Sequence, residues 1–221
     1  MGPKGDGVAA RDRRSQEERS RETSSKILDA AIDLIHDRGL TRLSTTDIAA
    51  HAGVSRGALT HHFASRDELI ITAVTRNLQQ VTETLHAFAL EVAERGGSSD
   101  EIVDRIWDVM NDRLFYITLE YLPEARHNPE FRARLVPMVR DFHAALDAIW
   151  MALASRCGTD PETTRTVLNA TMCLIRGMIA QTVLRDYPVY FAGLLAFWKD
   201  QVRGHFPSLP ARQAPARGGK A

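Results

Sequence analysis

The sequence lacks the features that mark secreted, disulfide-stabilised and membrane-spanning proteins. It contains only two cysteines, Cys157 and Cys173, which provide neither a disulfide framework nor the ligand spacing of a metal site. Its longest apolar run, Val189–Trp198, is too short to cross a bilayer, and the N-terminal residues show no apolar core of a signal peptide. We therefore expect a cytoplasmic protein with no membrane segment, no metal and no cofactor.

The chain also lacks an excess of charge of either sign. Its 28 basic residues are balanced by 28 acidic residues, so any attraction to nucleic acid has to come from a local basic surface. Hydrophobic residues make up 44% of the chain and charged residues 25%. This is the composition of an ordinary globular protein that is long enough to bury a core.

Alternating apolar patterns and Asn-Gly hairpin turns are missing, which argues against a sheet. Most segments between residues 23 and 206 have helical periodicity, so the sequence predicts an all-α protein. The two ends, residues 1–22 and 207–221, lack this periodicity, and we expect both to be disordered. Capping residues, glycines and prolines set the predicted helix limits. In order, the helices run from Thr23 or Ser24 to Gly39, Ser44 to Ala52, about two turns from Ser55, Ser65 to Gly96, Asp100 to Met110, Leu114 to Leu122, Asn128 to Arg156, Pro161 to Arg185 and Pro188 to His205.

Residues 45–63, TTDIAAHAGVSRGALTHHF, have the apolar and glycine spacing of a helix-turn-helix unit. Ala49 is small enough for two helices to cross closely, and Gly53 can take the positive φ of a tight turn without steric cost. Three apolar residues would anchor the second helix of the pair: Val54, Leu59 and Phe63. The opposite side of that helix is then left exposed.

The exposed side of this second helix is the predicted local basic surface, because no acidic residue occurs from Ile48 through Arg66. A helix N-terminus offers free amides and positive potential, so Ser55 is expected to hold a phosphate while Arg56 reaches a guanine edge. Thr45 and Arg66 are expected to contact phosphates on either side. The predicted DNA-binding residues are Thr45, Ser55, Arg56, Gly57, Thr60, His61 and Arg66.

Residues 24–78 resemble the DNA-binding domain of the TetR family of transcriptional regulators. The resemblance rests on the I-A-x-x-A-G-V-S-x-G-x-L core and on the H-F-x-S-[KR]-x-E-L run that opens the following helix. The sequence departs from the family at Thr60, where a tyrosine is usual, so a shorter side chain would have to meet a phosphate or a thymine methyl group. The resemblance implies a DNA-binding domain over residues 23–78 and a helical ligand-binding and dimerisation domain over residues 79–206.

The family also implies a homodimer that binds an inverted-repeat operator in double-stranded DNA and is released, as a repressor, by a small-molecule effector. The last two predicted helices have apolar faces broader than one core needs, so we expect them to pair across a two-fold axis. Aromatic and apolar residues of the middle helices would suit an apolar or aromatic effector, with His143 or Arg176 as polar anchor. The predicted ligand-binding residues are Trp107, Phe115, Tyr121, His143, Met172 and Arg176.

Two other functions compete with this interpretation. Residues 53–57 match the G-x-S-x-G nucleophile elbow of hydrolases and esterases, with Ser55 as nucleophile. An elbow has to follow a β-strand, whereas the sequence predicts a helix before Ser55, so we expect no enzymatic activity. A helical interaction scaffold without a DNA role would explain the helices but not the acid-free stretch. Salt-dependent binding to duplex DNA would distinguish these possibilities.

Overall fold

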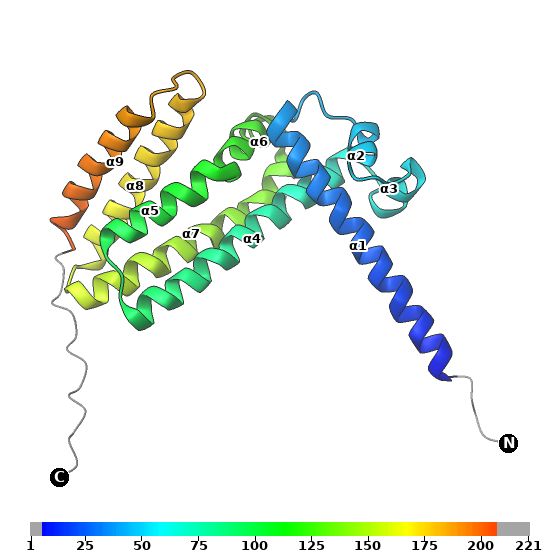
Figure 1. The fold of residues 1–221 in the computed structure, drawn as a ribbon, viewed down its shortest axis with the longest axis horizontal. Helices are drawn as coiled ribbons and strands as arrows, with labels where there is room; N and C mark the ends of the chain where they lie inside the picture. Colours follow the sequence, from blue (N-terminus) through cyan, green and yellow to red (C-terminus); the bar gives the residue numbers. More distant parts are fainter. Residues whose placement is uncertain (1–5, 207–221) are drawn as a thin grey trace, which may run out of the picture. The chain divides into compact units, whose positions relative to one another are not determined.

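Helices form all of the regular structure in the part of the chain that is described. The computed structural model describes the backbone of residues 6–206 and the side chains of residues 16–206. This range contains no strand, which confirms the predicted all-α fold (Figure 1). The elements in chain order are α1 (Asp6–Arg38), α2 (Thr45–His51), α3 (Arg56–His62), α4 (Arg66–Arg95), α5 (Ser99–Val109), the π-helical segment η1 (Met110–Leu114), α6 (Phe115–His127), α7 (Pro129–Cys157), α8 (Pro161–Thr182) and α9 (Pro188–Arg203).

The starts of α2 and α4 lie where the capping residues predict them. At the start of α2, the Ser44 hydroxyl accepts a hydrogen bond from the Asp47 amide (3.2 Å), and the Asp47 carboxylate accepts one from the Ser44 amide (3.2 Å). The Ser44 hydroxyl also donates to the Asp47 carboxylate, and this bond, with the one from the Ser44 amide, holds the pKa of Asp47 below its usual value. At the start of α4, the Ser65 hydroxyl accepts from the Glu68 amide (3.1 Å). Both caps satisfy amides that have no partner inside the helix.

The first helix differs from the prediction, because α1 begins at Asp6 and not near Thr23. The expected disorder of residues 1–22 is therefore wrong for residues 6–22, which are helical. This segment is rich in good helix formers and offers charge pairs one turn apart, such as Glu17 and Arg21 (4.0 Å). It has no apolar stripe, which was the signal used for the prediction. Residues 1–5 and the predicted C-terminal tail lie outside the described residues.

Packing divides the chain into two units. Unit 1 comprises the residues up to Val81 together with Asp112–Phe142, and unit 2 comprises Thr82–Asn111 together with the residues from His143 onward. The predicted division near residue 78 placed the whole of α6 with the second domain. In the structure, α6 packs on α1 within unit 1. Contacts of this kind join residues far apart in the sequence, and no local pattern reveals them.

The core of unit 1 is built around one face of α1. Ile27 and Ala31 on this face are fully buried. The face is covered by apolar residues from α2, α3, α4, α6 and α7: Ile48, Ala49, Leu59, Leu69, Ile70, Ala73, Val74, Ile117, Tyr121, Phe131 and Leu135. Burial of each large side chain contributes about 1.5–3 kcal/mol. Unit 1 is thus held by a single core that includes both helices of the helix-turn-helix pair.

Unit 2 is a helical assembly in which α5 packs on α8 and α9, and α8 and α9 lie side by side (Figure 1). Polar contacts tie α9 to its neighbours in this unit. The Trp198 indole N–H donates to the Thr171 hydroxyl of α8 (3.0 Å), and Lys199 forms an ion pair with Asp104 of α5. Of the helices in residues 6–206, none combines the length and apolar character that a membrane span needs.

The turn after α1 provides a test of this packing. Gly39 has φ +80°, and a Cβ there would lie 2.8 Å from the Glu120 carboxylate of α6, which accepts a hydrogen bond from the Leu40 amide (2.9 Å). We expect Gly39→Ala to lower the free energy of unfolding by about 2–3 kcal/mol, because a left-handed alanine costs about 1–2 kcal/mol and the bond about 1 kcal/mol more. The measurement is the urea-unfolding midpoint followed by circular dichroism.

The matched control for this prediction is Gly158→Ala. Gly158 has φ +75°, but a Cβ there would have nothing within 4 Å. It should therefore show only the backbone cost of about 1–2 kcal/mol. Equal losses in the two variants would contradict a stabilising role for the contact between Glu120 and Leu40.

Candidate nucleic-acid interface

Helices α2 and α3 form the predicted helix-turn-helix pair. Between them, Gly53 has φ +66°, the left-handed conformation that the sequence analysis required of it. The Val54 amide donates to the Ala49 carbonyl (3.0 Å), which closes the turn. Ala49 and Leu59 are buried in the unit 1 core. The two short helices are therefore held by the turn geometry and by the core beneath them.

One side of α3 faces solvent. Arg56, Gly57, Thr60 and His61 are exposed, as is Ser55 immediately before the helix. Ser55 is the N-cap of α3, and its hydroxyl accepts a hydrogen bond from the Ala58 amide (3.1 Å). Since the first turn of α3 contains no acidic residue, its positive N-terminal potential is not offset locally. The exposed surface of α3 is thus cationic and carries hydrogen-bond donors.

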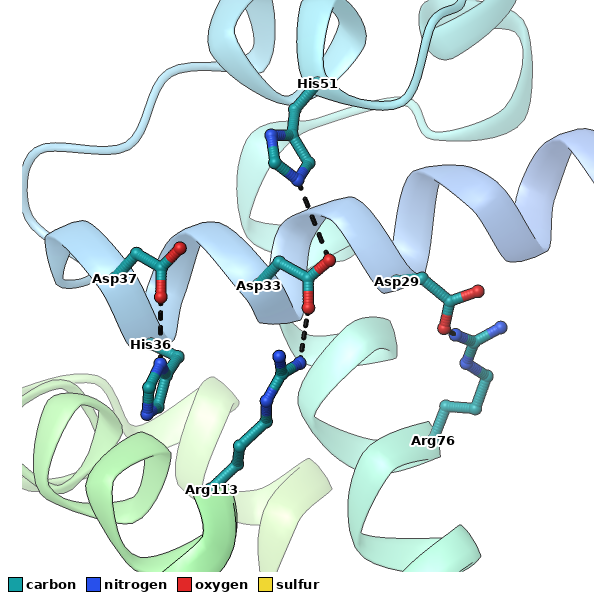
Figure 2. A network of polar contacts seen from close by, with 7 residues as sticks. All are labelled: Asp29, Asp33, His36, Asp37, His51, Arg76 and Arg113. Atoms are coloured by element: carbon teal, nitrogen blue, oxygen red, sulfur yellow. Dashed lines mark hydrogen bonds and ion pairs between the residues drawn. The ribbon is translucent and has the colours of Figure 1, made fainter.

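The side of α1 that is not buried carries a row of carboxylates at four-residue intervals, Asp29, Asp33 and Asp37 (Figure 2). Asp33 contacts two other elements, because one carboxylate oxygen pairs with Arg113 of η1 and the other lies 3.6 Å from His51 Nε2 of α2. Asp29 pairs with Arg76 of α4. Through these contacts the row connects α1 to α2, α4 and η1 within unit 1.

The third carboxylate of the row, Asp37, bonds within α1. Its Oδ1 lies 2.9 Å from His36 Nδ1, and this hydrogen bond holds the pKa of Asp37 below its usual value. The His36 ring also meets the Tyr116 ring of α6 edge to face, with centroids 5.9 Å apart. The four-residue spacing was visible in the sequence, but the partners lie too far along the chain to be predicted from it.

Comparison with known proteins agrees with this geometry. Residues 27–73 match the family described as bacterial regulatory proteins, tetR family. The HTH-type transcriptional regulator CymR of Pseudomonas putida is 25% identical over 171 residues, which cover 77% of this chain and 84% of that protein. Residues 27–73 therefore form a DNA-binding domain of the tetR family, in a chain that is similar to HTH-type transcriptional regulators over most of its length.

Two solved structures share the fold of this chain. A transcriptional regulator from Rhodococcus sp. Rha1 matches with a TM-score of 0.66 at 21% identity, covering 85% of this chain and 99% of that one. The regulator FadR from Bacillus subtilis, solved in complex with stearoyl-CoA, matches with a TM-score of 0.60 at 18% identity, covering 84% of this chain and 99% of that one. These two likenesses show that the chain shares its helical fold with both regulators over most of its length.

Arg66 has a different environment from the one expected for a phosphate contact. Its Nε donates to the Leu43 carbonyl (2.9 Å) and its Nη2 to the Leu40 carbonyl (2.6 Å), both in the loop between α1 and α2. Its Nη1 lies 3.5 Å from the Asp67 carboxylate. The guanidinium therefore fixes the loop that leads into α2. This makes Arg66 a positioning residue, which sequence reasoning missed because its partners are backbone atoms.

The other predicted DNA-binding residues lie at the start of α2, at the N-cap of α3 and along α3. Thr45 is the half-buried first residue of α2. The Thr60 hydroxyl lies 3.1 Å from both the Arg56 and the Gly57 carbonyls of its own helix, to which it donates. Direct contact of these residues with DNA stays a prediction. Ser55 follows helix α2 and a turn, so the β-strand that a nucleophile elbow requires is replaced by a helix.

The predicted effector residues are divided between the two units. Tyr121 belongs to the unit 1 core, and Phe115 is buried on the same helix. In unit 2 the structure brings together His143 Nε2 and Arg176 Nη2 (3.4 Å), and burial together with the Arg176 charge lowers the pKa of His143. Two residues remain in unit 2: Met172 is buried in the core, and Trp107 borders a cavity of about 380 Å³.

The position of Arg66 leads to a test that separates loop anchoring from phosphate binding. Arg66→Lys keeps the charge, but an ammonium cannot reach two carbonyls in the fork geometry of a guanidinium. We expect the free energy of unfolding to fall by about 1.5–3 kcal/mol, the contribution of a charged hydrogen bond. Urea unfolding of the protein without DNA measures this. Arg42→Lys, at an exposed arginine of the same loop, is the control, and equal stability of the two variants would contradict the anchoring role.

Proposed function

We propose that this TetR-family regulator is a cytoplasmic homodimeric repressor that binds an inverted-repeat operator through α3 and leaves it when a small apolar or aromatic effector binds. The observation that carries the proposal is the exposed, acid-free face of α3 on a helix-turn-helix whose opposite face is buried in the unit 1 core. Surfaces of this type enter the major groove with the N-terminal residues of the second helix at the base edges.

The residues of α3 suit direct reading of bases. Arg56 is exposed at the first position of the helix, and a guanidinium can donate two hydrogen bonds to the major-groove edge of guanine. We expect Ser55 and Thr45, at the starts of α3 and α2, to contact phosphates and so to orient the helix without selecting a sequence. His61 lies one turn after Gly57 on the exposed side and can contact a second base.

Homodimer formation is supported by apolar side chains that are exposed at the end of α8, in the following loop and on α9. Leu184 is 88% exposed and Val189 85% exposed. The same region exposes further large side chains: Val183, Tyr187, Tyr190 and Phe197. Large apolar side chains exposed along one stretch of chain often mark an interaction surface, and a second copy of the same surface would cover this patch across a two-fold axis.

Effector binding is supported by the fold relative FadR, which was solved with stearoyl-CoA. The physical basis of release is linkage, since an effector that binds better to a conformation unfit for DNA lowers the operator affinity by that preference. In a dimer, the two copies of α3 have to lie about 34 Å apart to enter successive major grooves. A change in that spacing is sufficient to release the operator.

Selection of bound sequences from a pool of random duplex DNA tests the proposal as a whole. Enrichment of an inverted repeat, with binding that weakens as salt rises, is the expected result. Enrichment of a single half-site would contradict the dimer. Failure to enrich any sequence would contradict DNA recognition and favour a helical interaction scaffold.

Arg56 should specify one base pair in each half-site. We expect Arg56→Ala to lower discrimination at that position by about 1–3 kcal/mol, because a bidentate contact to guanine is lost. Thr45→Val should weaken all sequences alike, as loss of a phosphate contact does. Fluorescence anisotropy on the selected site and its single-base variants measures both effects. Arg134→Ala, at an exposed arginine of α7, serves as the control for loss of charge, and unchanged base preference in Arg56→Ala would disprove the assigned contact.

The exposed patch predicts how the dimer can be separated. Leu184→Asp should weaken dimerisation about tenfold or more, because it places a charge in the apolar interface, and it should leave the helical content unchanged. Leu90→Asp on α4 replaces another exposed leucine (67% exposed) outside the patch and should remain dimeric. Sedimentation velocity over a concentration series measures the difference, and a Leu184→Asp variant that stays dimeric would place the interface elsewhere.

A further inference from the structure

Unit 2 contains a cavity of about 380 Å³ that lies apart from the contact between His143 and Arg176. Its walls come from α5 and η1 on one side, from the end of α8 and the loop after it, and from the first turns of α9. The volume falls in the range of about 300–1,000 Å³ that small-molecule sites occupy. Of the predicted effector residues, Trp107 borders this cavity.

We propose that this cavity binds a small, uncharged aromatic molecule with a polar edge. Only the regulatory role of this cavity rests on the proposed function. The binding of a ligand to the cavity does not, since it can occur whether or not the protein binds DNA. It identifies a site and a class of ligand for the effector that the proposed function requires.

Aromatic side chains from three elements make up the apolar part of the lining. Trp107 belongs to α5, Tyr187 to the loop before α9, and Phe191 to α9. Phe191 is only 4% exposed and Trp107 is half-buried, so both side chains are held in place by the fold. Rings held in this way favour a flat ligand, because offset-stacked and edge-to-face contacts need a π-system as partner.

The polar part of the lining favours a ligand without net charge. Two adjacent residues of opposite sign, Arg185 and Asp186, border the cavity and are both exposed. An ion of either sign would be attracted by one of them and repelled by the other. The Asn111 side-chain amide offers both a donor and an acceptor, which can bind the hydroxyl or amide group of a neutral ligand.

The lining also relates the cavity to unit 1 through the chain. Asn111 lies in η1, the segment that carries Arg113, and Arg113 pairs with Asp33 of α1. A ligand held by Asn111 therefore acts on the same π-helical segment that holds α1 by an ion pair. This supports an effector role for the cavity in addition to binding.

Isothermal titration of the full chain with three naphthalene probes of different charge tests the proposal. We expect 2-naphthamide, which is neutral, to bind at one molecule per chain. The anion 2-naphthoate and the cation 2-naphthylmethylammonium should bind about tenfold more weakly. Absence of heat with 2-naphthamide up to about 1 mM, the weak end of measurable affinity, would overturn the proposal. If either ion bound as tightly as 2-naphthamide or more tightly, the inference that the ligand is uncharged would be overturned.

Two matched variants locate the site. Ala192→Phe fills the cavity from an exposed position on its wall, and Ala196→Phe makes the same change one turn further along α9, outside the lining. We expect 2-naphthamide to bind at least about tenfold more weakly to the first variant and unchanged to the second. Equal loss in both would show that the probe occupies the α9 face between copies of the chain, which contradicts the cavity assignment.

Tryptophan emission gives a second measurement, which does not require the cavity-filling variant Ala192→Phe to fold. Binding of 2-naphthamide should change the emission of the native chain, and Trp107→Phe should remove most of that change when each protein is compared at a saturating concentration of the probe. An unaltered signal in Trp107→Phe would place the probe elsewhere. If 2-naphthamide binds as expected but leaves operator affinity unchanged, the cavity assignment stands and its role in release is contradicted.

Discussion

The buried face of α1 is the constraint on which the exposed side of α3, the proposed DNA-reading surface, depends. Helix α3 spans only Arg56–His62, and a helix of this length is not stable alone in water because nucleation costs more than so few hydrogen bonds return. It persists because Leu59 and Phe63 pack into the core formed around Ile27 and Ala31. The core therefore determines both that α3 forms and which of its sides faces solvent.

Carboxylates on the polar side of α1 help to orient the elements that pack on this helix. Apolar contacts are not directional, whereas the carboxylate of Asp29 pairs with Arg76 of α4, and that of Asp33 pairs with Arg113 of η1 and lies 3.6 Å from His51 Nε2 of α2 (Figure 2). Arg66 acts in the same way on the loop before α2. Exposed pairs of this kind contribute little to stability. Their effect is to fix the position of the helix-turn-helix pair relative to the helix that supports it.

Local signals in the sequence were sufficient to predict most of the fold and the helix-turn-helix pair that carries the candidate site. Ser44, Gly53 and Ser65 each have a conformation or a hydrogen bond that follows from residue type and spacing alone. The start of α1 was misjudged because a charged helix without a buried face has no apolar period. The roles of Arg66 and Glu120 were not predictable, since their partners are backbone groups brought close only by folding.

The division of the chain into two units could not be predicted from the sequence either. Ile117 and Tyr121 follow an ordinary helical pattern that does not say which core they enter. The units of the predicted effector-binding residues could not be predicted either. Phe115 and Trp107 are both aromatic residues of predicted helices, but they belong to different units. The pairing of His143 with Arg176 joins two residues already singled out as polar anchors, although their contact depends on α7 and α8 meeting in unit 2.

The central claim is that the exposed side of a core-anchored α3 is the surface that meets DNA. Hydrogen–deuterium exchange of the full chain, with and without duplex DNA carrying its selected site, tests this claim directly. The account predicts that DNA slows exchange across α3 and at the start of α2, because their amides become covered while the core beneath is unchanged. Protection confined to other helices, with unaltered exchange in α3, would contradict it.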